Sequence, residues 1–99
     1  MKAIHKKAII GKNVEIGDGT VVMAGAVINP SSKIGEQSII NTSSVIEHDS
    51  QIGNFSTIAP KVAMGGGVQI GNFSTISIGA TVKHLIKIGD DVVVGANSL

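Results

Sequence analysis

One histidine in this sequence stands between two acidic residues. His48 is preceded by Glu47 and followed by Asp49. Carboxylates on both sides favour the charged form of an imidazole, and histidine is the side chain best suited to exchanging protons near neutral pH. We therefore consider His48 a candidate general base.

A run of glycines that contains a possible oxyanion donor follows His48 in the sequence. Gly66 stands eighteen residues after His48, within the run Met64-Gly65-Gly66-Gly67. A backbone N–H that no side chain covers can stabilise an oxyanion, while a nearby base takes a proton from an attacking amine or hydroxyl. The pair would suit acyl transfer from a thioester, provided that the fold makes residues 48 and 66 neighbours.

A repeat of six residues provides a way to bring residues 48 and 66 close together. Every sixth residue from Ile4 to Val94 is aliphatic, and the residue four positions after each of these anchors is small or β-branched. A helix has a period near 3.6 and a strand a period of two, so neither explains a strict six. We therefore expect a chain that turns a corner every six residues.

A longer repeat of eighteen residues groups the hexapeptides in threes. The segments IGDG, IGEQ, IGNF, IGNF and IGDD begin at Ile16, Ile34, Ile52, Ile70 and Ile88. Three hexapeptides then form one triangular coil, and stacked coils pair as parallel strands about 4.8 Å apart. The sequence predicts an all-β fold, a left-handed parallel β-helix of about five coils, as a single domain over residues 1–99. Phe55 should lie over Phe73, with the isoleucine columns inside.

The composition argues against several classes of protein. The formal net charge is +1, there is no cysteine, and the aromatic content is 2%. A protein without an excess of basic residues lacks the positive charge that binds the phosphate backbone of nucleic acids. A protein without cysteine has neither disulfides nor thiolate zinc sites. No apolar stretch approaches the length of a membrane span. We expect a soluble, cytoplasmic protein with no nucleic-acid or membrane partner.

The segment INTSSVIEHDSQIGNFSTIAP, from Ile40 to Pro60, resembles the active-site region of acetyl-CoA-dependent acetyltransferases that modify sialic acid or nucleotide-linked amino sugars. The ungapped register extends this resemblance over nearly the whole chain. It implies transfer of an acetyl group from acetyl-CoA to an amine or hydroxyl of a sugar or nucleotide-sugar. His48 would be the general base, Asp49 the acid that strengthens it, and Gly66 the oxyanion donor.

The resemblance also implies a homotrimer that binds acetyl-CoA in the groove between neighbouring subunits. The matching cofactor-binding positions are Thr57, Gly66, Ile78 and Lys87, and Asn41 would help to orient the acceptor. Some relatives have a second histidine at the position of Thr57. Relatives usually add an N-terminal nucleotide-binding domain and a C-terminal tail, neither of which matches this sequence, so the resemblance covers the middle of the usual enzyme.

Two alternative functions are compatible with the same fold. Hexapeptide β-helices include zinc carbonic anhydrases, which use three histidines, two of them close in sequence. Here His5, His48 and His84 are widely separated; we expect no metal and interpret His5 and His84 as surface residues. The second alternative is a non-catalytic β-helix that serves as a structural or interaction module.

Overall fold

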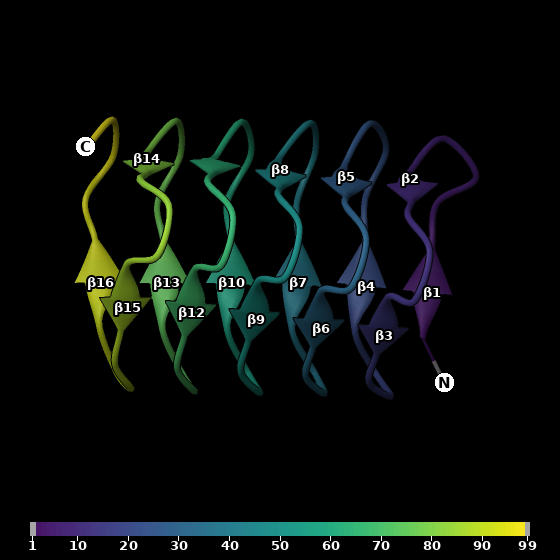
Figure 1. Cartoon of the computed structure of the whole chain (residues 1–99), viewed down its shortest axis with the longest axis horizontal. Helices are drawn as coiled ribbons and strands as arrows, with labels where there is room; N and C mark the ends of the chain where they lie inside the picture. Colours follow the sequence, from purple (N-terminus) through teal and green to yellow (C-terminus); the bar gives the residue numbers. More distant parts are fainter. Residues whose placement is uncertain (1, 99) are drawn as a thin grey trace.

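The protein is a stack of triangular coils, seen in a computed structural model that describes residues 2–98 (Figure 1). Each coil has three two-residue strands joined by corners, and each strand pairs in parallel with the strand eighteen residues away, as Thr57 does with Thr75. The coils advance along the longest dimension, which is 29 Å, and the chain ends lie at opposite ends of it. The predicted parallel β-helix of about five coils is confirmed.

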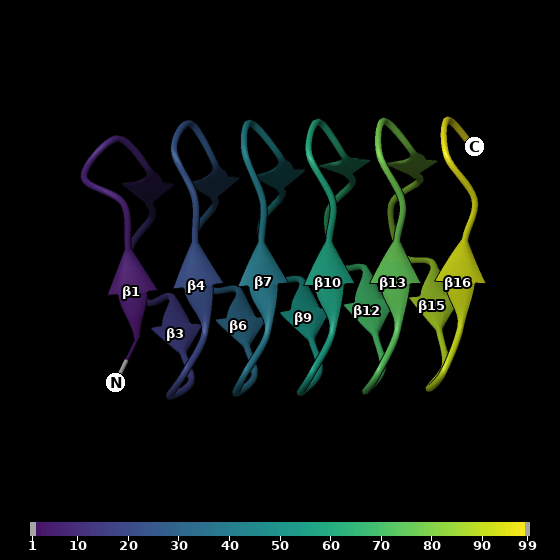
Figure 2. The ribbon, with the colours of Figure 1, turned by 180° about the vertical axis from the view of Figure 1, so that it is seen from behind.

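Three parallel sheets form the sides of the prism, and we call them sheets A, B and C. Figure 2 shows the strands of sheet A in a row from one end to the other. Sheet A consists of β1 (Ala3–Ile4), β4 (Val21–Val22), β7 (Ile39–Ile40), β10 (Thr57–Ile58), β13 (Thr75–Ile76) and β16 (Val93–Val94). Sheet B consists of β2 (Ile9–Ile10), β5 (Val27–Ile28), β8 (Val45–Ile46), β11 (Ala63–Met64) and β14 (Thr81–Val82). Sheet C consists of β3 (Glu15–Ile16), β6 (Lys33–Ile34), β9 (Gln51–Ile52), β12 (Gln69–Ile70) and β15 (Lys87–Ile88).

The second residue of each strand points into the prism and forms its core. Ile28, Ile40, Ile46, Ile58 and Ile76 are fully buried. Burial of an aliphatic side chain of this size contributes about 1.5–3 kcal/mol, and here each coil buries its residues against the next. The anchors become more exposed towards the ends of the stack. No helix long and apolar enough to cross a membrane occurs between residues 2 and 98.

Buried serines join the coils at the inner side of the corners. The Ser56 hydroxyl donates to the carbonyl of Gly71 over 2.7 Å and accepts from the backbone N–H of Ser74 over 3.1 Å. Ser74 repeats this arrangement with Gly89 and Val92 in the following coil. Because a buried hydroxyl without a partner is costly, these bonds explain why small hydroxyl residues recur four positions after the anchors.

Each corner contains a residue in the left-handed region of φ. This residue lies three positions after the anchor, and its φ is between 54° and 76° from Asn13 onwards. Asparagine, aspartate and glycine tolerate such φ values, whereas a phenylalanine there is uncommon. Phe55 and Phe73 occupy two of these positions and stack with their ring centroids 5.1 Å apart, as predicted from the sequence.

Candidate active site

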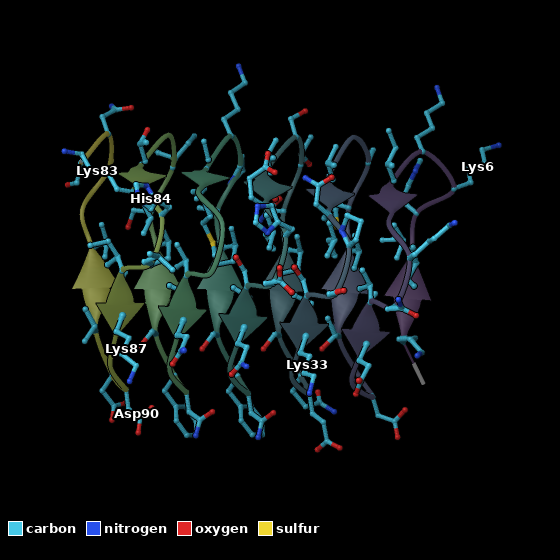
Figure 3. All side chains as sticks on the ribbon, viewed as in Figure 1. Lys6, Lys33, Lys83, His84, Lys87 and Asp90 are labelled. Carbon is cyan, nitrogen blue, oxygen red and sulfur yellow. The ribbon has the colours of Figure 1, made fainter. Side chains whose placement is uncertain are left out.

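The corner between sheets B and C brings the predicted base and oxyanion donor together. His48 lies between β8 and β9, and Gly66 lies between β11 and β12 in the next coil. One coil further, His84 follows β14, where it is labelled in Figure 3. The repeat of eighteen therefore stacks these three residues in one column.

His48 is paired with the carboxylate of the residue that follows it. The Nδ1 atom of His48 lies 3.0 Å from Oδ2 of Asp49, and the two side chains are 65% and 67% exposed. A carboxylate at Nδ1 favours the proton on that nitrogen, which leaves the lone pair of Nε2 free to accept a proton. The left-handed φ of 59° at Asp49 forms part of the turn that holds the carboxylate in place.

The His48 ring lies directly against Gly66. A Cβ atom at position 66 would be 2.9 Å from both Cε1 and Nε2 of the ring. This separation is shorter than real contacts of a Cβ atom, so a side chain at position 66 would push the imidazole away. Glycine is therefore required here for the close approach of the base.

The N–H of Gly66 is open. Gly65 donates to the carbonyl of Val82 and Gly67 to that of His48, while the carbonyl of Gly66 accepts from Leu85. No hydrogen bond of the Gly66 N–H occurs within residues 2–98. An unpaired amide beside an imidazole with a free Nε2 can donate to the oxygen of a polarised carbonyl.

A hollow of about 400 Å³ surrounds these groups. Its floor is the pair Gly66–Gly67; its lining residues are His48, Asp49, Gly66, Gly67, His84 and Leu85. His84, interpreted from the sequence as a surface residue, is exposed and also lines this hollow. The spacing of eighteen residues between Gly66 and His84 could have predicted from the sequence that His84 lines the hollow. The same spacing, between Gly67 and Leu85, could have predicted this for Leu85.

The other predicted site residues lie elsewhere on the prism. Thr57 points outward from β10 on sheet A, which is the side opposite the corner of His48. Asn41 and Ile78 follow β7 and β13 and so occupy the corner between sheets A and B. Lys87 lies on β15 of sheet C, beyond His84 (Figure 3). Within a single chain, the structure therefore groups His48, Asp49 and Gly66 but not Thr57, Ile78 or Asn41 with them.

Metal ligands do not gather at this corner. Within residues 2–98, no three histidine, aspartate or glutamate side chains are placed to hold one metal ion. His5 follows β1 and belongs to the corner between sheets A and B, and His48 and His84 are two coils apart. The zinc alternative thus gains no support from the arrangement of the histidines.

Comparison with solved structures gives matches over the whole repeat region. The chain is 41% identical to a perosamine N-acetyltransferase from Caulobacter crescentus that was solved in complex with CoA and GDP-perosamine, with a TM-score of 0.95. The match covers 97% of this chain and 46% of the Caulobacter protein. The chain therefore spans slightly less than half the length of this relative.

Two further structures agree. An acetyltransferase domain from Neisseria gonorrhoeae is 28% identical, with a TM-score of 0.75 over 100% of this chain and 51% of that one. A hexapeptide-repeat acetyltransferase from Vibrio cholerae shares the fold, with a TM-score of 0.81 at 18% identity, over 99% of this chain and 68% of its own.

No family model and no curated protein matches the sequence. The structural neighbours are hexapeptide-repeat acetyltransferases. Because 41% of the aligned residues are identical to those of the perosamine enzyme, this chain resembles that enzyme in sequence as well as in fold.

Proposed function

We propose that this chain is the β-helix portion of an acetyltransferase that moves an acetyl group from acetyl-CoA to the amine of a nucleotide-linked amino sugar. The observation that carries the proposal is the contact between the His48 ring and Gly66, whose N–H is open. A base and an oxyanion donor on adjacent coils are the two groups that acyl transfer requires. The complexes of the Caulobacter relative with CoA and GDP-perosamine support this donor and acceptor, and favour an amine over a hydroxyl.

The reaction would begin with attack of the amine nitrogen on the thioester carbonyl. Nε2 of His48 accepts the proton that the amine loses, and Asp49 at 3.0 Å stabilises the imidazolium that results. The carbonyl oxygen becomes an oxyanion and accepts a hydrogen bond from the N–H of Gly66. Cleavage of the carbon–sulfur bond then releases the thiolate of CoA, which takes the proton back from His48. The balance is one amide formed and one thioester broken.

The rest of the cofactor site needs a second chain. Thr57 and Ile78 lie away from the His48 corner, so they could contact the same acetyl-CoA only if they belong to a neighbouring subunit. Lys87, on sheet C, would contact it from the same subunit as His48. We propose that a homotrimer completes the groove in this way, with Asn41 near the acceptor.

The outward faces of the sheets support such an assembly. Sheets A and B present exposed aliphatic residues, among them Ile9, Ile39 and Val93. Sheet C presents an outward row of polar residues instead: Glu15, Lys33, Gln51, Gln69 and Lys87. Because oligomer interfaces are richer in apolar side chains than free surfaces, we expect sheets A and B to face neighbouring subunits. The expected cytoplasmic location stays a prediction.

The test is transfer by the purified protein, whose mass in solution is first measured by light scattering. Acetyl-CoA and GDP-perosamine are supplied together, CoA release is followed with a thiol reagent, and the acetylated product is identified by mass spectrometry. Product formation by a trimer would support the proposal. A folded protein that releases CoA no faster with the acceptor than without it would favour the alternative, a non-catalytic structural or interaction module.

A further inference from the structure

The two walls of the hollow at the corner between sheets B and C differ in chemistry. The wall on the side of the preceding coil is the hydrogen-bonded pair His48–Asp49, which is polar throughout. The wall on the side of the following coil consists of His84 and Leu85. Leu85 is therefore the one lining residue with an apolar side chain.

The leucine side chain leans over the glycine floor. Its Cδ2 atom is 2.8 Å from the place that a Cβ atom would take at Gly67, and the side chain is 73% exposed. A side chain at position 67 would collide with it, so the glycine makes room for the leucine. Leu85 thus lines the hollow above Gly67, the residue next to Gly66.

The fold does not account for a leucine at this position. Leu85 has a φ of 62°, a conformation that costs an ordinary residue about 1–2 kcal/mol. Phe55 and Phe73 have the same kind of φ but stack on each other, whereas the Leu85 side chain is largely exposed and its near contact is with a glycine. We therefore expect the role of this side chain to concern a ligand in the hollow.

The position of the thioester follows from the proposed function, on which this inference rests. If the thioester oxygen is held by the N–H of Gly66, the acyl carbon lies within a few ångströms of that amide. The amine must approach from the side of His48, because Nε2 takes its proton. Of the two remaining substituents on the acyl carbon, the alkyl group and the sulfur, we assign the alkyl group to the wall that carries Leu85, because a methyl group gains an apolar contact there.

We propose that Leu85 limits the size of the acyl group that this site accepts, and so selects acetyl over longer acyl groups. In this arrangement the methyl group of an acetyl lies beside Gly66, whereas the longer chain of a propionyl group extends onto the leucine side chain. One methylene in a confined apolar site changes discrimination by about 10-fold or more. Leu85 acts here as a specificity-determining residue and takes no part in proton transfer.

The test compares acetyl-CoA with propionyl-CoA as donors for the whole protein and for Leu85→Gly. Glycine removes the side chain and also accepts the left-handed φ, so we expect Leu85→Gly to fold. The ratio of kcat/KM for acetyl-CoA to that for propionyl-CoA should fall about tenfold. Leu85→Asn, which keeps a side chain of similar length and tolerates this φ, should retain the preference within about threefold.

The matched control is Phe73→Gly. It also removes an exposed apolar side chain from a corner residue of positive φ, but at the corner between sheets C and A. Its donor preference should equal that of the original protein. An unchanged preference in folded Leu85→Gly, or an equal change in Phe73→Gly, would overturn the role of Leu85.

A binding measurement separates this inference from the proposed function. If the protein transfers neither acyl group, the proposed function fails, and calorimetric titration with the two thioesters decides the role of Leu85. A Kd ratio that favours acetyl-CoA in the original protein and falls severalfold in Leu85→Gly would support the inference. Equal Kd ratios in the two proteins, or no binding of either thioester, would overturn it.

Discussion

The backbone N–H two positions after an anchor is hydrogen-bonded at one corner of the prism and has no hydrogen bond at another. At the corner between sheets C and A, three successive N–H groups are bound by a side chain from the next coil: Glu36 donates to Oδ1 of Asn54, Asn54 to Oδ1 of Asn72 and Asn72 to Oδ1 of Asp90, over 2.7–2.8 Å. At the corner between sheets B and C, the equivalent N–H of Gly66 has no acceptor within residues 2–98.

We infer from the comparison that a repeat can acquire a site, such as the one proposed, without a change of fold. The ladder of Asn54, Asn72 and Asp90 occupies the N–H groups of Glu36, Asn54 and Asn72, so these amides are not free to bind a substrate. The histidine corner has the same turn and the same spacing, but its column places an imidazole beside an open amide. Because this amide is at the surface, water can bind it when no substrate is present, so the opening costs the fold little. We therefore place the proposed function at the corner where these side-chain bonds are missing.

Removing the base at the open corner should have the largest effect. His48→Ala takes away the Nε2 that accepts the proton, and a general base contributes about 10²- to 10⁴-fold to the rate. Since the side chain is 65% exposed and its partner is the equally exposed Asp49, the fold should persist. The measurement is the initial rate of CoA release with acceptor, and an unchanged rate would remove His48 from the mechanism.

Closing the open amide should have the next largest effect. His84→Asn would repeat the ladder at this corner, because the introduced asparagine would stand one coil after Gly66 as Asn72 stands one coil after Asn54. Gly65 has no side chain to obstruct one at position 84, just as Gly53 has none to obstruct Asn72 at the ladder corner. The oxygen of the new side chain should then occupy the N–H of Gly66. Loss of one oxyanion donor costs about 10²- to 10³-fold in kcat.

His84→Ala provides the control for this closure. It removes the same imidazole but leaves the N–H of Gly66 open, so its kcat should exceed that of His84→Asn by at least about tenfold. Equal losses in the two variants would mean that the open amide is not what the asparagine affects.

Opening the closed corner should have the smallest effect, and it should act on stability alone. Asn72→Ala leaves the N–H of Asn54 without its acceptor, and a hydrogen bond of this kind contributes about 0.5–1.5 kcal/mol. The free energy of unfolding in urea should fall by about that amount, while the rate of acetyl transfer stays unchanged. A large loss of activity would show that the ladder corner contributes to the site.

Much of this arrangement could be predicted from the sequence, because the repeat fixes which residues share a column. The strict periods of six and eighteen placed Gly66 beside His48 and Phe55 over Phe73. The direction of corner side chains could not be predicted in the same way. Whether a side chain folds back over the previous coil, as those of Asn72 and Leu85 do, depends on the local φ and on the space at a glycine one coil earlier.

The NMR signal of the Gly66 amide tests most directly whether this N–H binds the thioester oxygen. Isotope-labelled protein is titrated with acetyl-CoA without acceptor, and the amide resonances of Gly66 and Asn54 are followed. We expect the Gly66 signal to shift as its N–H binds the thioester oxygen, while the signal of Asn54, whose N–H is already bonded to Asn72, stays in place. A Gly66 signal that does not move at saturating acetyl-CoA would contradict its role as the oxyanion donor.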